Sequence, residues 1–316
     1  MKQHIDALVQ DYQTGQLSRR EFLRRAGVLL GGLTAAHTLL VACGGTETAT
    51  SPAEPAADTP APDEMDALET PDEATDTQPE VEDVTATGEI TTEMVTFAAN
   101  GDEAPGYLAR PTGDGPFPGV VVIQEWWGLE EHIQSVTERF AQMGFVALAP
   151  DLYRGEVAEE PDDARRLAMA LERDQALVDI QGAANYLLDQ AFVEPKRAGI
   201  VGFCLGGGLA MNMSYVGEDI GAVVVFYGGG VEPTDEDFEA VTAPVLGIYG
   251  EADQGIPVKQ VEQWESAFAE FGKTNEMIIY PDAPHAFFND TRDSYREEAA
   301  EDAWQRTIAW FQQYLS

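Results

Sequence analysis

A cysteine lies at the centre of a glycine-rich stretch, GFCLGG (202–207), directly after the mostly apolar run RAGIV. The pentapeptide GFCLG fits the nucleophile elbow G-x-S-x-G, with Cys204 in place of serine. In such an elbow the chain turns so tightly from strand to helix that side chains at Gly202 and Gly206 would collide. Because a helix N-terminus favours a thiolate, Cys204 is a candidate nucleophile. A buried core cysteine and a redox thiol are the alternatives.

Two further residues occur in the order that this kind of site requires. In the fold that carries the elbow, an acid and then a histidine follow the nucleophile along the chain. His285 is the single histidine after Cys204, and Asp253 lies between them in YGEADQGIP (249–257). Both directly follow predicted strands. We therefore expect His285 to take the thiol proton and Asp253 to hold the imidazole in the correct tautomer. Glu251 and Asp282 are the substitutes for Asp253.

The stretch QEWWGL (124–129) follows another predicted strand, at the place from which this fold supplies an oxyanion-hole N–H. We assign that hole to the backbone of Trp126 and Leu205. Glu125 would then lie beside the thiol, where a carboxylate could accept the thiol proton or keep the cysteine neutral until substrate arrives. Trp127, like Trp126, either forms an apolar pocket wall or packs on the sheet.

The elements needed to position these residues alternate between strands and helices. The stretch 93–111 is predicted to be a hairpin that turns at Asn100-Gly101. The other predicted strands are 117–125, 145–151, 197–203, 221–229, 243–250 and 275–281, and the predicted helices are 132–144, 161–190, 205–216, 257–272 and 294–315. This alternation predicts an α/β fold, with a mainly parallel sheet covered by helices on both faces. Catalytic residues are expected at the carboxyl ends of its strands.

The composition excludes some classes of partner. The 316 residues include 56 Asp+Glu against 18 Lys+Arg, a formal net charge of −38. Phosphate backbones would be repelled by this charge, so we expect no nucleic-acid partner. Metal binding is not expected, because two of the four histidines, His4 and His37, lie near the N-terminus and leave only His132 and His285. The two cysteines, Cys43 and Cys204, give no disulfide framework.

The N-terminal region is typical of an export signal. The stretch SRREFLRR (18–25) precedes a run of mostly apolar and small residues (26–42), and the adjacent Arg19 and Arg20 resemble a twin-arginine signal. The ending LVAC (40–43) resembles a lipobox, which predicts that Cys43 is acylated after removal of residues 1–42. Residues 43–93 are rich in Thr, Ala, Pro and acidic residues, so we expect an acidic disordered tether. The remaining residues, 94–316, form the predicted globular domain.

With these motifs in place, residues 93–316 resemble the dienelactone hydrolase family of the α/β-hydrolase superfamily. The resemblance is carried by QEWWGL, APDLYRG (149–155), GFCLGG, GEADQGIP and DAPHAFFN (282–289). It implies that the family's Cys-His-Asp triad and neighbouring glutamate correspond to Cys204, His285, Asp253 and Glu125. It also implies an acyl-enzyme intermediate and no cofactor.

The chain departs from the family where an arginine four residues beyond the histidine helps to bind the substrate carboxylate. Asn289 occupies that position. Arg154 and Arg166 are candidates for a second substrate-binding arginine, as is Arg165. The departure favours a different ester or lactone over a dienelactone.

These observations predict an exported hydrolase of carboxylic esters or lactones, anchored to the outer side of the cell membrane through lipidated Cys43. We expect a monomer that acts on a small molecule. A tethered binding protein and a thiol redox sensor are the alternatives, although a sensor would need a resolving cysteine.

Overall fold

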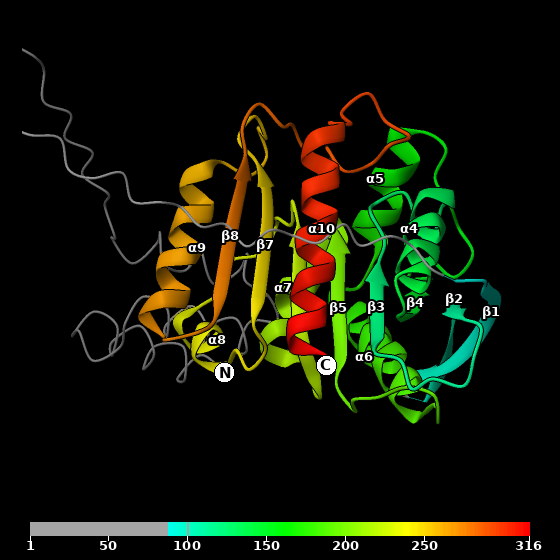
Figure 1. The fold of residues 1–316 in the computed structure, drawn as a ribbon. Coiled ribbons are helices and arrows are strands. Elements are labelled where there is room, and N and C mark those ends of the chain that lie inside the picture. The colour runs from blue at the N-terminus through cyan, green and yellow to red at the C-terminus, as the bar shows by residue number, and fades with distance from the viewer. Residues whose placement is uncertain (1–87, 100) are drawn as a thin grey trace, which may run out of the picture. The chain divides into compact units, whose positions relative to one another are not determined.

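A single sheet of eight strands organises the part of the chain that the computed structural model describes, residues 88–99 and 101–316. The strand order is β1-β2-β4-β3-β5-β6-β7-β8 (Figure 1). The strands are β1 (Ile90–Ala99), β2 (Asp102–Pro111), β3 (Gly119–Ile123), β4 (Val146–Pro150), β5 (Ala198–Phe203), β6 (Ile220–Phe226), β7 (Val245–Gly250) and β8 (Asn275–Tyr280). From β4 to β8 the neighbouring strands are parallel, whereas β1 and β2 form an antiparallel edge.

The antiparallel edge is the predicted hairpin. Ala99 pairs with Asp102, so the connection has two residues, and Gly101 has the positive φ of 87° that such a turn needs. Asn100 lies outside the described residues. The predicted boundary between the tether and the globular domain, at residue 94, is wrong, because the sheet already begins at Ile90. Ile90–Glu93 belong to β1, where they pair with the end of β2 from Leu108 to Pro111.

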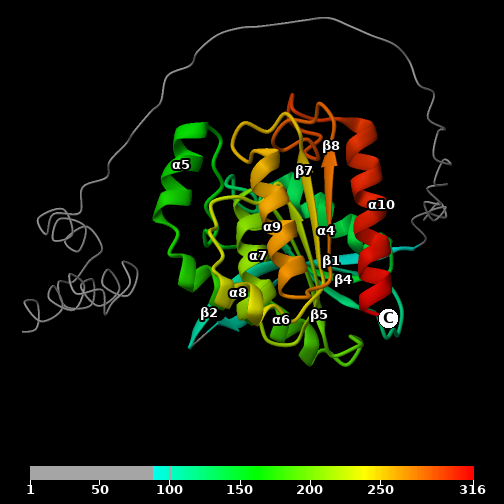
Figure 2. The same ribbon diagram turned by 90° about the vertical axis from the view of Figure 1, so that its left-hand side faces the viewer.

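Seven helices are described, and they cover both faces of the sheet, as predicted. They are α4 (Glu131–Gln142), α5 (Pro161–Ala170), α6 (Arg173–Asp189), α7 (Leu205–Val216), α8 (Asp235–Ala240), α9 (Val258–Glu270) and α10 (Glu297–Tyr314). Figure 2 shows α10 on one side of the sheet and α7 and α9 on the other. Rings of α4 and α10 meet, with Phe140 4.6 Å from Trp304 between ring centroids, so these two helices share a face. The α/β-hydrolase architecture expected from the sequence is therefore confirmed.

Two helical predictions need correction. The stretch 161–190 is two helices, because Leu171 and Glu172 adopt extended backbone angles between α5 and α6. The short helix α8 was not predicted. It begins at a capping box, in which the Thr234 hydroxyl accepts from the Asp237 N–H and the Asp237 carboxylate accepts from the Thr234 N–H.

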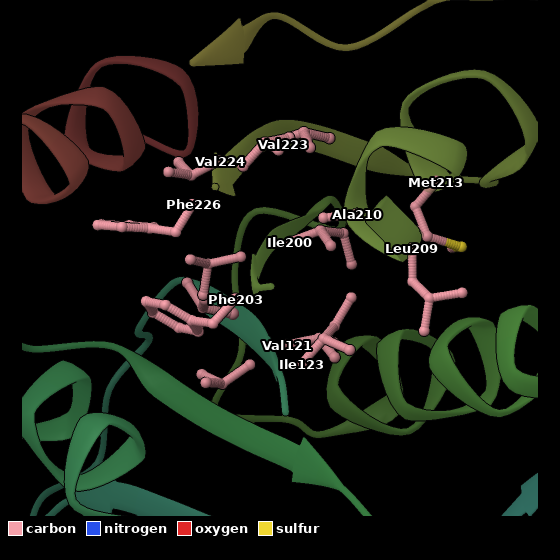
Figure 3. Close-up of a cluster of buried hydrophobic side chains, with 14 of the residues drawn as sticks. Val121, Ile123, Ile200, Phe203, Leu209, Ala210, Met213, Val223, Val224 and Phe226 are labelled. Carbon is pink, nitrogen blue, oxygen red and sulfur yellow. The ribbon is translucent and has the colours of Figure 1, made fainter. Parts of the chain in front are cut away.

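The centre of the core is formed by apolar residues of the parallel strands, and apolar residues of the helices, such as Phe140 and Phe311, pack against them. Figure 3 shows Ile200 and Val223 on the side of α7, and Phe203 and Phe226 on the opposite side. This alternation follows from the two-residue period of a strand, and it explains the almost uninterrupted apolar runs, since both faces are buried. None of the helices within residues 88–99 and 101–316 combines the length and the apolar character that a membrane span requires.

The junction of β5 and α7 is the tightest point of the fold. A Cβ atom on Gly202 would lie 2.0 Å from the Gly206 carbonyl oxygen, and one on Gly206 would lie 2.5 Å from the carbonyl oxygens of Ile123 and Gln124. Between these glycines Cys204 has φ 54° and ψ −112°. Backbone meets backbone here, so no flexible side chain can move aside to make room for a larger residue.

We expect Gly202→Ala to destabilise the fold by about 3 kcal/mol or more, because the added methyl would overlap the backbone of α7. Urea unfolding followed by circular dichroism measures this change. Gly88→Ala is the control, because nothing lies within 4 Å of a Cβ there. Equal stabilities of the two variants would contradict the packing described.

Candidate active site

Cys204 directly follows the carboxyl end of β5 and directly precedes the first residue of α7. Its N–H donates to the Phe226 carbonyl oxygen at 3.1 Å, which ties the turn to the neighbouring strand β6. The side chain is half-buried and the thiol is free. Its position directly before α7 places the sulfur near the positive end of that helix.

Asp253 and His285 are brought together from the ends of β7 and β8. The His285 Nδ1 and Asp253 Oδ2 atoms are 2.6 Å apart. The other carboxylate oxygen, Oδ1, accepts from the backbone N–H groups of Gly255 at 2.7 Å and Ile256 at 3.2 Å. The carboxylate is therefore fixed on both sides, while the imidazole side chain stays 40% exposed. This is the arrangement that orients an imidazole for proton transfer.

The loop that carries His285 is anchored from below by aromatic residues. Phe287 and Phe288 are buried, and the Phe288 ring lies 4.8 Å from Phe226 and 5.4 Å from Phe203 between centroids. The Tyr227 ring meets the His285 ring edge to face at 5.1 Å. The histidine is thus held by the core, even though it sits on a loop.

The charges at this site support one another. Burial alone would lower the pKa of His285, but hydrogen bonds to Asp253 and Cys204 and the charges of both outweigh it and raise the pKa to about 10. Burial likewise raises the pKa of Asp253, yet the contact with His285 and the two backbone N–H groups bring it below its ordinary value. The His285 imidazole therefore keeps its proton to a higher pH than an exposed histidine does.

Glu125 is buried beneath the site, with a side chain satisfied by two neutral donors. Its Oε1 accepts from the Tyr227 hydroxyl at 3.2 Å, and its Oε2 accepts from the Asn289 amide at 2.9 Å. Burial raises the pKa of Glu125 above its ordinary value despite these two bonds. Since no cation bonds to it, this carboxyl group is held closer to protonation than a surface glutamate.

The two residues of the proposed oxyanion hole lie in different local structures. Trp126 is in the turn after β3, and Leu205 is the first residue of α7. Within the described residues, the N–H groups of Trp126 and Leu205 donate to no protein acceptor. The Tyr153 hydroxyl donates to the Trp126 carbonyl oxygen at 3.2 Å and so holds this turn in place. Both N–H groups therefore remain available to a substrate oxygen.

A cavity of about 490 Å³ opens above the sulfur. Its lining residues are Glu125, Trp126, Trp127, Cys204, His285, Ala286, Arg292, Asp293 and Ser294. Trp126 and Trp127 meet edge to face at 5.1 Å, so the tryptophans form a pocket wall. Arg292, Asp293 and Ser294 were not predicted, and the predicted helix began at 294. The helix starts only at Glu297, which leaves these residues on the loop that follows the histidine.

The three substrate-binding candidates besides Trp127 do not reach this cavity. Asn289 is fully buried against Glu125, and its Oδ1 accepts from the Thr291 N–H and hydroxyl. The Arg154 guanidinium lies 2.8 Å from Asp179 in a different hollow of about 690 Å³, which lacks Cys204. Arg166 forms exposed ion pairs on α5. None of these three side chains lines the cavity beside Cys204, and their contact with substrate stays a prediction.

The remaining candidates are also placed by the structure. Arg165 pairs with Asp162 on the surface of α5. Glu251 and Asp282 are exposed and make no hydrogen bond to His285, so Asp253 alone of the three acids touches the imidazole. Cys43 lies outside the described residues. In the described part of the chain no group of three or more His, Cys, Asp or Glu side chains could hold a metal ion.

The His285–Asp253 contact predicts a measurable titration. In Asp253→Asn the carboxylate is lost while burial remains, so the pKa of His285 should fall from about 10 by about one to three pH units. NMR titration of the imidazole measures this change. Asp282→Asn is the matched control, because it removes the same charge from an exposed site whose positive φ asparagine tolerates. An unchanged pKa in Asp253→Asn would contradict the contact.

The chain is similar in sequence to known proteins over most of its length. The model of the dienelactone hydrolase family matches residues 104–315. A protein of Methylorubrum extorquens assigned as a carboxymethylenebutenolidase is 37% identical over 224 residues, which cover 66% of this chain and 77% of that protein. Protein usf of Aquifex pyrophilus is also 37% identical, over 71% of this chain and 99% of its own length.

A solved structure agrees with these matches. The crystal structure assigned as a dienelactone hydrolase from Klebsiella pneumoniae subsp. pneumoniae superposes with a TM-score of 0.67 at 35% identity, covering 72% of this chain and all of that one. The family match at residues 104–315 includes the segments that carry Cys204, Asp253 and His285. The chain therefore belongs to the dienelactone hydrolase family and is a hydrolase of the carboxymethylenebutenolidase type.

Proposed function

We propose that this protein hydrolyses carboxylic esters or lactones through an acyl-enzyme formed on Cys204. The observation that carries the proposal is the 2.6 Å contact between His285 and the buried Asp253. Cys204 lines the same cavity as His285 and contributes to the raised pKa of that imidazole. In the proposed reaction Cys204 is the nucleophile, His285 the base and Asp253 the orienting acid. The cavity is large enough for a small ester or lactone.

The proposed reaction follows from these contacts. The Cys204 thiolate attacks the carbonyl carbon, and the negative oxygen of the tetrahedral intermediate accepts from the N–H groups of Trp126 and Leu205. The C–O bond breaks, and the leaving oxygen takes a proton from the His285 imidazolium. Water then attacks the thioester while His285 accepts a proton from that water. Collapse of the second intermediate releases the acid and restores the thiolate and imidazolium.

Glu125 is the remaining ionisable group beneath the sulfur. Burial raises its pKa above the ordinary value of a glutamate, which makes it a better proton acceptor than an exposed carboxylate. It either accepts the thiol proton or keeps Cys204 neutral until substrate arrives. Both roles need a carboxyl group that is buried and bonded only by neutral donors, which Tyr227 and Asn289 provide.

Replacing the triad should abolish turnover. We expect Cys204→Ala and His285→Ala to lower kcat/KM for 4-nitrophenyl acetate by about a thousandfold or more, because each removes a step of the proposed reaction. Asp282→Asn, with its exposed side chain, is the control and should match the wild type. Release of 4-nitrophenolate measures the rate. A single stoichiometric burst without steady turnover would instead favour a binding protein or a thiol sensor.

We also propose that the chain is exported and anchored to the outer side of the cell membrane through a lipid on Cys43. Support comes from the sequence: paired Arg19 and Arg20, the apolar run and the LVAC ending. A lipid anchor would hold the enzyme at the membrane while the acidic linker extends the domain away from it.

Lipidation makes a separate prediction. Cys43→Ser should abolish labelling by radioactive palmitate and move the protein from the membrane to the soluble fraction, because the acylated sulfur is removed. Cys204→Ser replaces the other cysteine of the chain and should keep both properties. Labelling that survives in Cys43→Ser would exclude Cys43 as the lipid site.

A further inference from the structure

Arg292 is the one cationic side chain, apart from His285, among the described residues that line the catalytic cavity. Its guanidinium carbon lies 4.1 Å from the centre of the Trp127 ring, and its Nη2 lies 3.1 Å from Oε2 of Glu130. Both partners of this ion pair are largely buried, with side chains 34% and 17% exposed. The guanidinium is therefore held in place by a carboxylate and an aromatic face together.

The charge of Arg292 is already matched within the protein. Glu130 takes one formal charge, and Asp293, the next residue along the loop, adds another carboxylate to the cavity lining. Asn289 fills the position expected for a cation with a neutral amide that is bonded to Glu125. An anionic group that enters between Trp126 and Trp127 would thus lose its hydration. In return it would meet Arg292, a cation whose charge is already neutralised by carboxylates of the protein.

A neutral substrate fits the same surroundings better. The buried Nε–H of Arg292 has no acceptor among the described residues, and a neutral carbonyl or ether oxygen can accept a hydrogen bond from such a donor. Trp126 and Trp127 offer apolar area to an uncharged ring or chain.

We propose that the cavity selects uncharged esters or lactones, and that Glu130 is the positioning residue that sets this preference by neutralising Arg292. The inference rests on the proposed hydrolase function and narrows its substrate class. Glu130 acts through Arg292 and is absent from the lining of the cavity itself. Removing its charge should therefore change the binding of anionic substrates more than the chemical step.

The test compares two aryl acetates, 4-acetoxybenzamide and 4-acetoxybenzoate. Both form the same acetyl-enzyme, so they differ only in the leaving group, which is neutral in one and carries a carboxylate in the other. Comparison with the alkaline hydrolysis rate of each ester accounts for the different acidity of the two phenols. For the wild type we expect kcat/KM, corrected for alkaline hydrolysis, to favour the amide by about tenfold or more, since like charges disfavour entry of the carboxylate. Glu130→Gln should lower the ratio of kcat/KM for 4-acetoxybenzamide to kcat/KM for 4-acetoxybenzoate by about tenfold. The change should arise mainly from a lower KM for 4-acetoxybenzoate.

Asp162→Asn is the matched control. It removes one carboxylate from an exposed ion pair with Arg165 on α5, so it has the same effect on net charge without touching the cavity. Its ratio should equal that of the wild type. Circular dichroism checks that Glu130→Gln is folded. The preference of the wild type for the amide is measured without any variant, so it tests the inference independently of how Glu130→Gln folds.

Some outcomes would overturn the inference. A wild-type preference for 4-acetoxybenzoate would show that Arg292 receives anions, and an unchanged ratio in folded Glu130→Gln would show that Glu130 does not set the preference. Failure of the underlying hydrolase function looks different, because then neither ester would be turned over in a manner that depends on Cys204.

Discussion

The close approach of two backbones at Gly202 and Gly206 is the constraint on which the site depends. With no Cβ on either residue, α7 starts directly against β5 and against the end of β3, and Cys204 is forced to φ 54°. A residue in this region of backbone space is strained, and here the strain is held by the buried strands on both sides. The result is a sulfur that projects beyond the sheet at the start of a helix.

The other groups of the site depend on this placement in turn. Asp253 and His285 follow β7 and β8, the last two strands of the parallel sheet, whose carboxyl ends lie at the same edge as that of β5. Phe288 anchors the histidine loop in the core beside Phe203 and Phe226, the residues that end β5 and β6, and Phe287 packs against Tyr227. The loop that carries His285 is thus an extension of the hydrophobic core.

Glu125, Tyr227 and Asn289 form a buried hydrogen-bond network near Cys204. This network explains how Asn289 can stand at the position where the family pattern has an arginine. Asn289 donates to Glu125 from a position where a cation would neutralise that carboxyl group, so burial decides its protonation instead. The cation of the pocket lies three residues further on, at Arg292, where Glu130 and Trp127 hold it.

The sequence by itself determined the α/β class, the hairpin, the positions of the strands along the chain and the motifs that contain Cys204, Asp253, His285 and Glu125. These depend on local glycine geometry, apolar periodicity and position after a strand, all of which can be read along the chain. Only the tertiary structure decided that α5 and α6 are separate helices, that Asn289 is buried, and that Arg292 rather than Arg154 or Arg166 lines the cavity. The physical reason is that an arginine reaches whichever carboxylate lies nearest in space, and those distances are fixed by packing between segments far apart in the chain.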